Sequence, residues 1–311
     1  MTQENLTRAP LDSGAQTTEW HRAKRARRLR DDLEAYAFLG PFLAIFIVFT
    51  VAPAIFGVGI SFMKWDILGT PSWRGIGNYV RIFNDPMFIA SIINTFKFML
   101  LTVIPLVTIG LALAMLLNAG LRGTVIARTI IFMPYVITVS AVGILWVWIY
   151  DGNTGLINYY LSLLGIAPIL WLTEKGSAMI ALAITTVWWT VNVNMIIYLA
   201  GLQDIPRELY EAAQLDGANG WEQFKRVTLP LLGPVHAFVV PLTVIGAWRV
   251  FGQVYVMTKG GPEASTFVMA QYTYLTAFQN FEMGPAAASA VVLLLITLVF
   301  SLIQLRAFKV L

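Results

Sequence analysis

Long apolar runs alternate with short polar segments along almost the whole chain. A helix needs about 20 mostly apolar residues to cross a bilayer, and six runs meet that requirement. They cover residues 36–63, 90–118, 128–150, 177–203, 231–257 and 284–306. Of the prolines inside these runs, five are expected to bend their helices because proline lacks a backbone donor: Pro41, Pro53, Pro105, Pro134 and Pro241. The pattern predicts an all-α, polytopic membrane protein with six transmembrane helices.

The composition supports this interpretation and excludes several kinds of chemistry. Hydrophobic residues make up 58% of the 311 positions and charged residues only 12%, about half the charged fraction of soluble domains. The sequence contains no cysteine and only two histidines. Disulfides, thiol catalysis, cysteine-ligated metals and histidine metal clusters are therefore not expected.

Basic residues are concentrated on one side of the predicted membrane. Six of them lie between Arg22 and Arg30, directly before the first apolar run. Such a cluster could bind nucleic acid or anionic lipid, but its place beside a span favours a topogenic signal and no nucleic-acid partner. Fourteen of the 21 Lys and Arg residues fall on the side of the N-terminus and five on the other. Both termini are therefore predicted to be cytoplasmic, and residues 1–35 to form a basic cytoplasmic segment.

The first apolar run is expected to be retained rather than cleaved as a signal peptide. It is about twice as long as the usual h-region of roughly 7–15 residues. Residues 36–311 are accordingly predicted to form one transmembrane domain.

The most charged interior segment is the predicted cytoplasmic loop 204–230. Pro206 is suited to the start of a helix, and the pair Asp216-Gly217 is suited to its end because glycine adopts the left-handed conformation. A second amphipathic helix is expected over 218–228. Leu229-Pro230 is then expected to break the chain before the fifth span. The pattern predicts two short helices at the membrane surface.

This loop carries a spaced motif: Glu-Ala-Ala, three residues, Gly, nine residues, a β-branched residue, one residue, Leu-Pro. Its positions are Glu211, Ala212, Ala213, Gly217, Val227, Leu229 and Pro230. The motif resembles the EAA loop of bacterial ABC importer permeases, and Asp216 and Ala218 extend it to the pattern of the carbohydrate-uptake (maltose/glycerol-phosphate) branch. The stretches "GIGNYVRIFNDPMF", "MPYVITVSAVGILWVWIYDGNTGLIN" and "MTKGGPEASTFVMAQYTYLTAF" are similar to the same branch.

The resemblance implies a type I ABC importer permease fold in the bacterial cytoplasmic (inner) membrane. It also implies that the loop docks on a cytoplasmic ATPase, with Glu211 meeting a basic residue. The implied partners are an ATPase dimer, a second homologous permease and an extracytoplasmic solute-binding protein. No cofactor is expected in this chain, because ATP and Mg would be bound by the ATPase subunits.

Polar residues in the fourth and fifth spans are candidates for the solute pathway. Aromatic rings and hydroxyl or amide groups suit a sugar, which has an apolar face and many hydroxyls. The same side chains could equally join helices to one another. Arg249 could also extend to the interface, pair with another subunit or attract an anion. The candidates are Thr186, Trp189, Thr190, Asn194, Thr243, Arg249 and Gln253.

The leading hypothesis is a permease subunit that imports a sugar or related polyol by alternating access, driven by a separate ATPase. An ion-coupled secondary transporter is the alternative, but that class usually shows acidic residues within its spans, and the predicted spans contain no Asp or Glu. A membrane-embedded enzyme would need a clustered acid–base or metal constellation, which the sequence does not show. Monosaccharides, disaccharides, oligosaccharides and glycerol-phosphate all stay open as solutes.

Overall fold

The computed structural model describes residues 36–67, 69–120 and 122–308, so the predicted basic segment 1–35 lies outside the described residues. Within these ranges, five helices are long and apolar enough to cross a membrane: Tyr36–Ser61, Pro86–Asn118, Lys175–Gln203, Gly233–Met257 and Met283–Ala307. A bent pair, Thr124–Val136 and Val139–Ile149, is the candidate for a sixth span. The predicted helical membrane fold is therefore confirmed, and the bent pair contains Pro134, one of the five prolines predicted to bend a helix.

The chain divides into two units at Gly57. The described part of the first unit is most of the helix Tyr36–Ser61, which contains a π-helical turn η1 (Ile47–Val51) followed by α2 (Ala52–Ser61). The Ala52 N–H donates to the Ile47 carbonyl five residues earlier. Pro53, the next residue, has no N–H and its ring clashes with the carbonyl four residues back, so the helix widens by one residue instead of ending.

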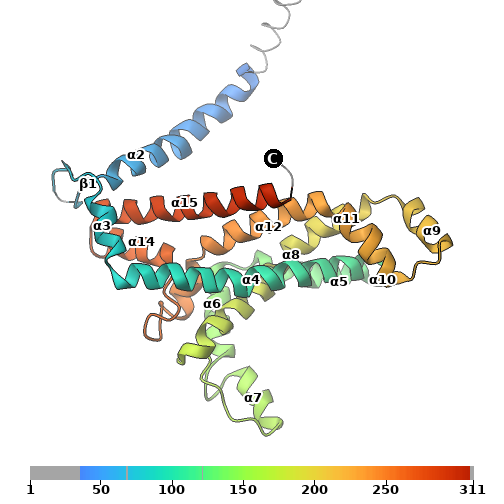
Figure 1. The fold of residues 1–311 in the computed structure, drawn as a ribbon. Helices are drawn as coiled ribbons and strands as arrows, with labels where there is room; N and C mark the ends of the chain where they lie inside the picture. Colours follow the sequence, from blue (N-terminus) through green and yellow to red (C-terminus); the bar gives the residue numbers. More distant parts are fainter. Residues whose placement is uncertain (1–35, 68, 121, 309–311) are drawn as a thin grey trace, which may run out of the picture. The chain divides into compact units, whose positions relative to one another are not determined.

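The second unit is built around α4 (Pro86–Asn118) and α8 (Lys175–Gln203), which pack along each other. Gly110 of α4 lies against α8, where an added Cβ would stand 2.8 Å from the Asn194 Cβ. The missing side chain therefore allows the two backbones to approach closely. Helix α12 (Gly233–Trp248) packs on α4 and on α15 (Met283–Ala307), and α14 (Met269–Phe278) packs on α15 (Figure 1).

The predicted third span is broken rather than continuous. Helices α5 (Thr124–Phe132) and η2 (Met133–Val136) form one arm, α6 (Val139–Ile149) forms the other, and the arms meet at 100°. Pro134 opens the 3-10 turn, and Ile137 and Thr138 are extended. Because proline cannot continue the α-helical hydrogen bonding, the chain leaves the helix here and begins a new one. The short helices α7 (Leu156–Leu163) and α13 (Gly252–Met257) were not predicted as separate elements, and α6 packs on α13.

The end of the bundle away from the 204–230 loop is joined by polar contacts. A hairpin of β1 (Met63–Lys64) and β2 (Ser72–Trp73) leads into α3 (Gly77–Phe83) (Figure 1). Asn78 of α3 donates to the carbonyls of Ser61 and Met63, at 2.9 and 2.7 Å. This amide therefore attaches α3 to the chain that enters the hairpin.

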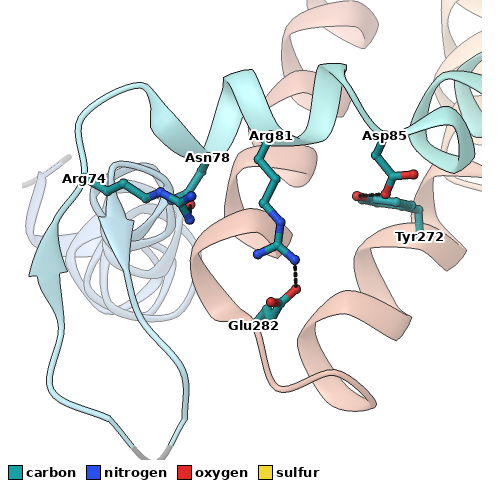
Figure 2. A network of polar contacts seen from close by, with 6 residues as sticks. All are labelled: Arg74, Asn78, Arg81, Asp85, Tyr272 and Glu282. Carbon is teal, nitrogen blue, oxygen red and sulfur yellow. Dashed lines mark hydrogen bonds and ion pairs between the residues drawn. The ribbon is translucent and has the colours of Figure 1, made fainter.

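Four residues in the same region form what we call the polar clamp: Arg81, Asp85, Tyr272 and Glu282. The Arg81 guanidinium lies 2.8 Å from the Glu282 carboxylate, and the Tyr272 hydroxyl donates to Asp85 Oδ2 at 2.8 Å. Figure 2 shows both pairs. The hydrogen bond to Glu282 raises the pKa of Arg81. The clamp joins α3 and the start of α4 to α14 and the start of α15.

Candidate functional site

A cavity of about 410 Å³ lies among α4, η2, α8, α12 and α13. Six of the seven predicted pathway residues line it: Thr186, Trp189, Thr190, Asn194, Thr243 and Gln253. Its walls also include residues that the sequence analysis missed, among them Phe98, Thr102, Tyr135 and Phe251. No charged side chain occurs among the described residues that line it. The cavity therefore offers aromatic, hydroxyl and amide groups without a net charge.

One polar pair in the wall joins two helices. The Asn194 amide of α8 donates to Thr243 Oγ1 of α12 at 3.1 Å, and the Thr243 hydroxyl lies 2.7 Å from the Val239 carbonyl. Both side chains are buried. The two side chains bond to each other, as helix-joining residues do, and they hold α8 and α12 together at the cavity.

Gln253 is the wall residue whose hydrogen bonding is incomplete. Its side-chain amide lies 3.0 Å from the Thr186 hydroxyl, which in turn lies 2.7 Å from the Leu182 carbonyl. A hydroxyl has one proton, so the shorter contact to Leu182 uses it, and the Gln253 NH₂ is the better donor to Thr186. Either orientation of the amide leaves one of its two polar atoms without a partner among the described residues, in a residue that is only 4% exposed. Leaving such a group unsatisfied costs about 1–3 kcal/mol, so it is well suited to a solute hydroxyl.

Trp189 connects the cavity to the break in the third span. Its indole Nε1 donates to the Ile137 carbonyl at 3.2 Å, and Ile137 lies in the extended segment between η2 and α6. A carbonyl freed by a helix break needs a donor when it lies at membrane depth. The ring is therefore fixed at the bend, beside Tyr135 in the cavity wall.

Arg249, the seventh candidate, does not line this cavity. One side of α12 faces the cavity through Thr243, Gly246, Ala247 and Val250. Another side, with Ile245 and Arg249, lines a separate groove against α15. Residues four apart share one side of a helix, and the packing of α15 decides which side that is. The sequence shows where Arg249 stands along the span but not the direction in which it faces.

The 204–230 loop contains the predicted first helix, α9 (Arg207–Leu215). Gly217 has a φ of +81°. Its N–H donates to the Gln214 carbonyl at 3.0 Å, and the Ala218 N–H donates to the Ala213 carbonyl at 2.9 Å. This pattern is the Schellman C-cap, so the predicted helix stop at Asp216-Gly217 is confirmed.

The second loop helix begins at Gly220 and does not end at Leu229-Pro230. The Asn219 side chain accepts from the N–H groups of Trp221 and Glu222, and the Glu222 carboxylate accepts from the Asn219 N–H. This capping box starts α10 (Gly220–Gln223), and its Asn-x-x-Glu pattern was readable in the sequence.

Helix α10 continues through the π-turn η3 (Phe224–Thr228) and α11 (Leu229–Leu231) towards α12. Pro230 itself stays within the helix, because the π-turn accommodates this proline as η1 accommodates Pro53. The predicted break before the fifth span falls two residues later, at the non-helical residue Leu232. A hydrogen bond of 2.9 Å between the Tyr210 and Thr228 hydroxyls joins α9 to η3.

The outer face of the loop is apolar as well as charged. Leu215 is 89% exposed and Trp221 is 70% exposed, while Glu211 and Ala212 are also exposed. Exposed apolar side chains grouped with charged ones mark interaction surfaces. The loop thus presents a surface suited to contact with another protein.

Comparison with known proteins identifies the class of this chain. Residues 106–307 match the family described as "Binding-protein-dependent transport system inner membrane component". The chain is 33% identical to the arabinooligosaccharides transport system permease protein AraP of Bacillus subtilis, over 96% of this chain and 94% of that protein. It is 34% identical to the trehalose/maltose transport system permease protein MalF of Thermococcus litoralis, over 90% and 95% of the two chains.

A solved structure has the same fold. It is the crystal structure of a bacterial ABC transporter involved in the import of the acidic polysaccharide alginate, with a TM-score of 0.80 and 24% identity over 92% of this chain and 98% of that one. The chain therefore belongs to the family of binding-protein-dependent transport system inner membrane components, and it has the type I ABC importer permease fold. It is a transport subunit, and the part of the chain that the structure describes holds no group of three or more His, Asp or Glu residues that could bind a metal.

Proposed function

We propose that this subunit forms one side of the membrane pathway for a sugar or related polyol. Two similar permeases are named for oligosaccharide or disaccharide transport. The observation that carries the proposal is the uncharged cavity, because its aromatic rings and the half-paired Gln253 amide suit the apolar face and the hydroxyls of a sugar. Thr186, Trp189, Thr190, Asn194 and Thr243 would complete the wall.

The second part of the proposal concerns the 204–230 loop as the contact with an ATPase. Glu211 would pair with a basic residue of that subunit, while Ala212 and Ala213 would allow a close backbone approach. Asp216 and Gly217 would set the turn, and Leu229 and Pro230 would set the exit into α12. The loop follows α8 and precedes α12, and both helices line the cavity.

The proposed machine contains two ATPase subunits, which would bind ATP and Mg, and a second homologous permease that completes the pathway. An extracytoplasmic binding protein would deliver the solute. Both chain termini would be cytoplasmic. ATPase closure would bring the two permease loops together and switch the pathway from inward-open to outward-open, a rigid-body mode of switching.

The coupling role is tested by comparing Glu211→Gln with Glu208→Gln, two exposed glutamates on α9. In vesicles that contain the full transporter, Glu211→Gln is expected to lower ATP-driven sugar uptake, because the loop loses its charge-assisted bond to the ATPase. Glu208→Gln is expected to retain uptake. Equal uptake by both variants would contradict the role of Glu211.

The pathway is tested by Gln253→Leu, with the exposed Gln279→Leu as its control. Losing one solute hydrogen bond of about 0.5–1.5 kcal/mol is expected to raise the solute concentration for half-maximal uptake by roughly 2–10-fold. Uptake that persists without the ATPase would favour an ion-coupled transporter and contradict the whole proposal.

A further inference from the structure

A second recess lies on the other side of α12 from the candidate pathway. It is a groove of about 420 Å³ between α12 and α15, which run side by side (Figure 1). Arg249 is exposed at this groove, and its guanidinium forms no hydrogen bond or ion pair with the residues that the structure describes. The rest of the lining comes from Ile245, Ala290, Leu293, Leu294, Thr297, Leu298 and Ser301.

Apart from Arg249, the lining of the groove is mostly apolar and offers no free hydrogen-bond donor among the described side chains. The Thr297 hydroxyl donates to the Leu293 carbonyl at 2.7 Å, and the Ser301 hydroxyl donates to the Thr297 carbonyl at 2.9 Å. Both hydroxyl protons are therefore used within α15. A ligand of this groove needs a negative charge at the Arg249 end and hydrocarbon along the rest.

The groove is about as long as one leaflet of a bilayer is thick, and its wall on α15 lies around the middle of that helix. Arg249 follows α12, about 24 Å along the helix from Gly233 at a rise of about 1.5 Å per residue. It thus lies in the leaflet opposite the 204–230 loop, within a hydrocarbon layer of about 30 Å, and its long side chain can extend towards the headgroups. The groove wall from Ala290 to Ser301 covers about 16 Å of α15, close to half that layer.

Charge decides between the possible occupants. The helix Tyr36–Ser61 contains no Asp or Glu, and the other candidate spans contain none either. Neither the first helix nor a span of a second copy can therefore neutralise Arg249. We propose that the groove binds an anionic phospholipid, with its phosphate on Arg249 and one acyl chain between α12 and α15. A guanidinium binds a phosphate through two parallel hydrogen bonds, and this pairing removes the cost of an unpaired cation at the membrane.

The test uses the assembled transporter in a neutral detergent, titrated with phosphatidylglycerol or with phosphatidylcholine of the same acyl chains. Native mass spectrometry counts the lipids that remain bound. We expect one phosphatidylglycerol at this groove, bound about five-fold more tightly than phosphatidylcholine, the effect of one cation near a membrane surface. Arg249→Gln should abolish the preference, and Arg249→Lys should retain most of it.

Two further variants keep the test decisive if Arg249→Gln destabilises the protein. Lys97→Gln removes another exposed cation of a membrane-spanning helix that does not line the groove, and it should leave the preference unchanged. Ala290→Trp keeps the charge but fills the groove, and it should lower phosphatidylglycerol binding. Soluble glycerol phosphate should not compete, since it has no acyl chain.

Three results would overturn the proposal. The first is a phosphatidylglycerol preference that survives Arg249→Gln or Ala290→Trp. The second is displacement of the lipid by glycerol phosphate. The third is binding to the isolated chain that disappears in the assembled transporter, which would mean that the second permease covers the groove.

Discussion

The contact between α4 and α8 at Gly110 makes a specific prediction about stability. In Gly110→Ala, the new Cβ would stand 2.8 Å from the Asn194 Cβ and 3.3 Å from the Met195 backbone nitrogen. Neither atom is the end of a flexible side chain, so no rotamer change relieves the overlap. The two helices must separate by about 0.6 Å to reach an ordinary contact of 3.4 Å.

The expected cost follows from two opposing effects. Overpacking of this kind costs about 1–3 kcal/mol, whereas alanine favours a helix over glycine by about 1 kcal/mol. Gly246 of α12 supplies the matched control, because an added Cβ there meets nothing within 4 Å. Gly246→Ala should therefore stabilise the protein slightly, and Gly110→Ala should be less stable than this control by about 1–3 kcal/mol.

Thermal unfolding of the purified variants in one detergent measures this difference. At about 2–4 °C per kcal/mol, the Gly110→Ala midpoint should lie roughly 2–10 °C below that of Gly246→Ala. Because the displaced Asn194 is bonded to Thr243 in the cavity wall, Gly110→Ala should also reduce sugar uptake. Equal midpoints, or a higher midpoint for Gly110→Ala, would refute the close-approach argument.

Three further predictions concern residues outside the spans. Gly217→Ala should cost about 1–2 kcal/mol locally, because alanine disfavours the φ of +81°; amide exchange at 213–218 should accelerate, and Gly220→Ala should leave it unchanged. Tyr272→Phe should lower stability by about 1 kcal/mol through loss of the bond to Asp85, measured by thermal unfolding. Hydrogen bonds from Thr154 and Asn153 lower the pKa of the Asp151 carboxyl below its usual 3.8. The ionised carboxylate therefore stabilises the fold above pH 3.8, and this stabilisation is lost as the pH falls through the lowered pKa. Asp151→Asn should remove this dependence from an acid unfolding titration.

The elements that follow from local chemistry could be predicted from the sequence. Apolar runs located the membrane helices because a bilayer demands a certain length of hydrocarbon contact. Asp216-Gly217 located the end of α9 because only glycine tolerates that backbone conformation readily. Six of the candidate residues line one cavity because polar groups within two neighbouring spans avoid lipid.

The features that depend on packing or direction could not be predicted. Pro134 predicted a bend within 128–150, but hydropathy is the same for a slightly bent and a sharply broken span, so the angle of 100° was not predicted. The position of Arg249 along α12 did not indicate that it faces α15. Pro230 suggested a break because proline removes a hydrogen bond, yet a π-turn can absorb that loss without ending the helix.

The continuity from α10 to α11 has a mechanical consequence. Helical structure runs from Gly220 to Leu231 and resumes at Gly233, and the Tyr210–Thr228 hydrogen bond fastens α9 to this rod near its midpoint. Thr243 lies 15 residues beyond Thr228, about 22 Å along the helical path and across the non-helical residue Leu232. A displacement of α9 would therefore be transmitted to the segment that contains Thr243 with little loss to flexible connecting chain. A flexible, glycine-rich connector in the same place would instead absorb the displacement.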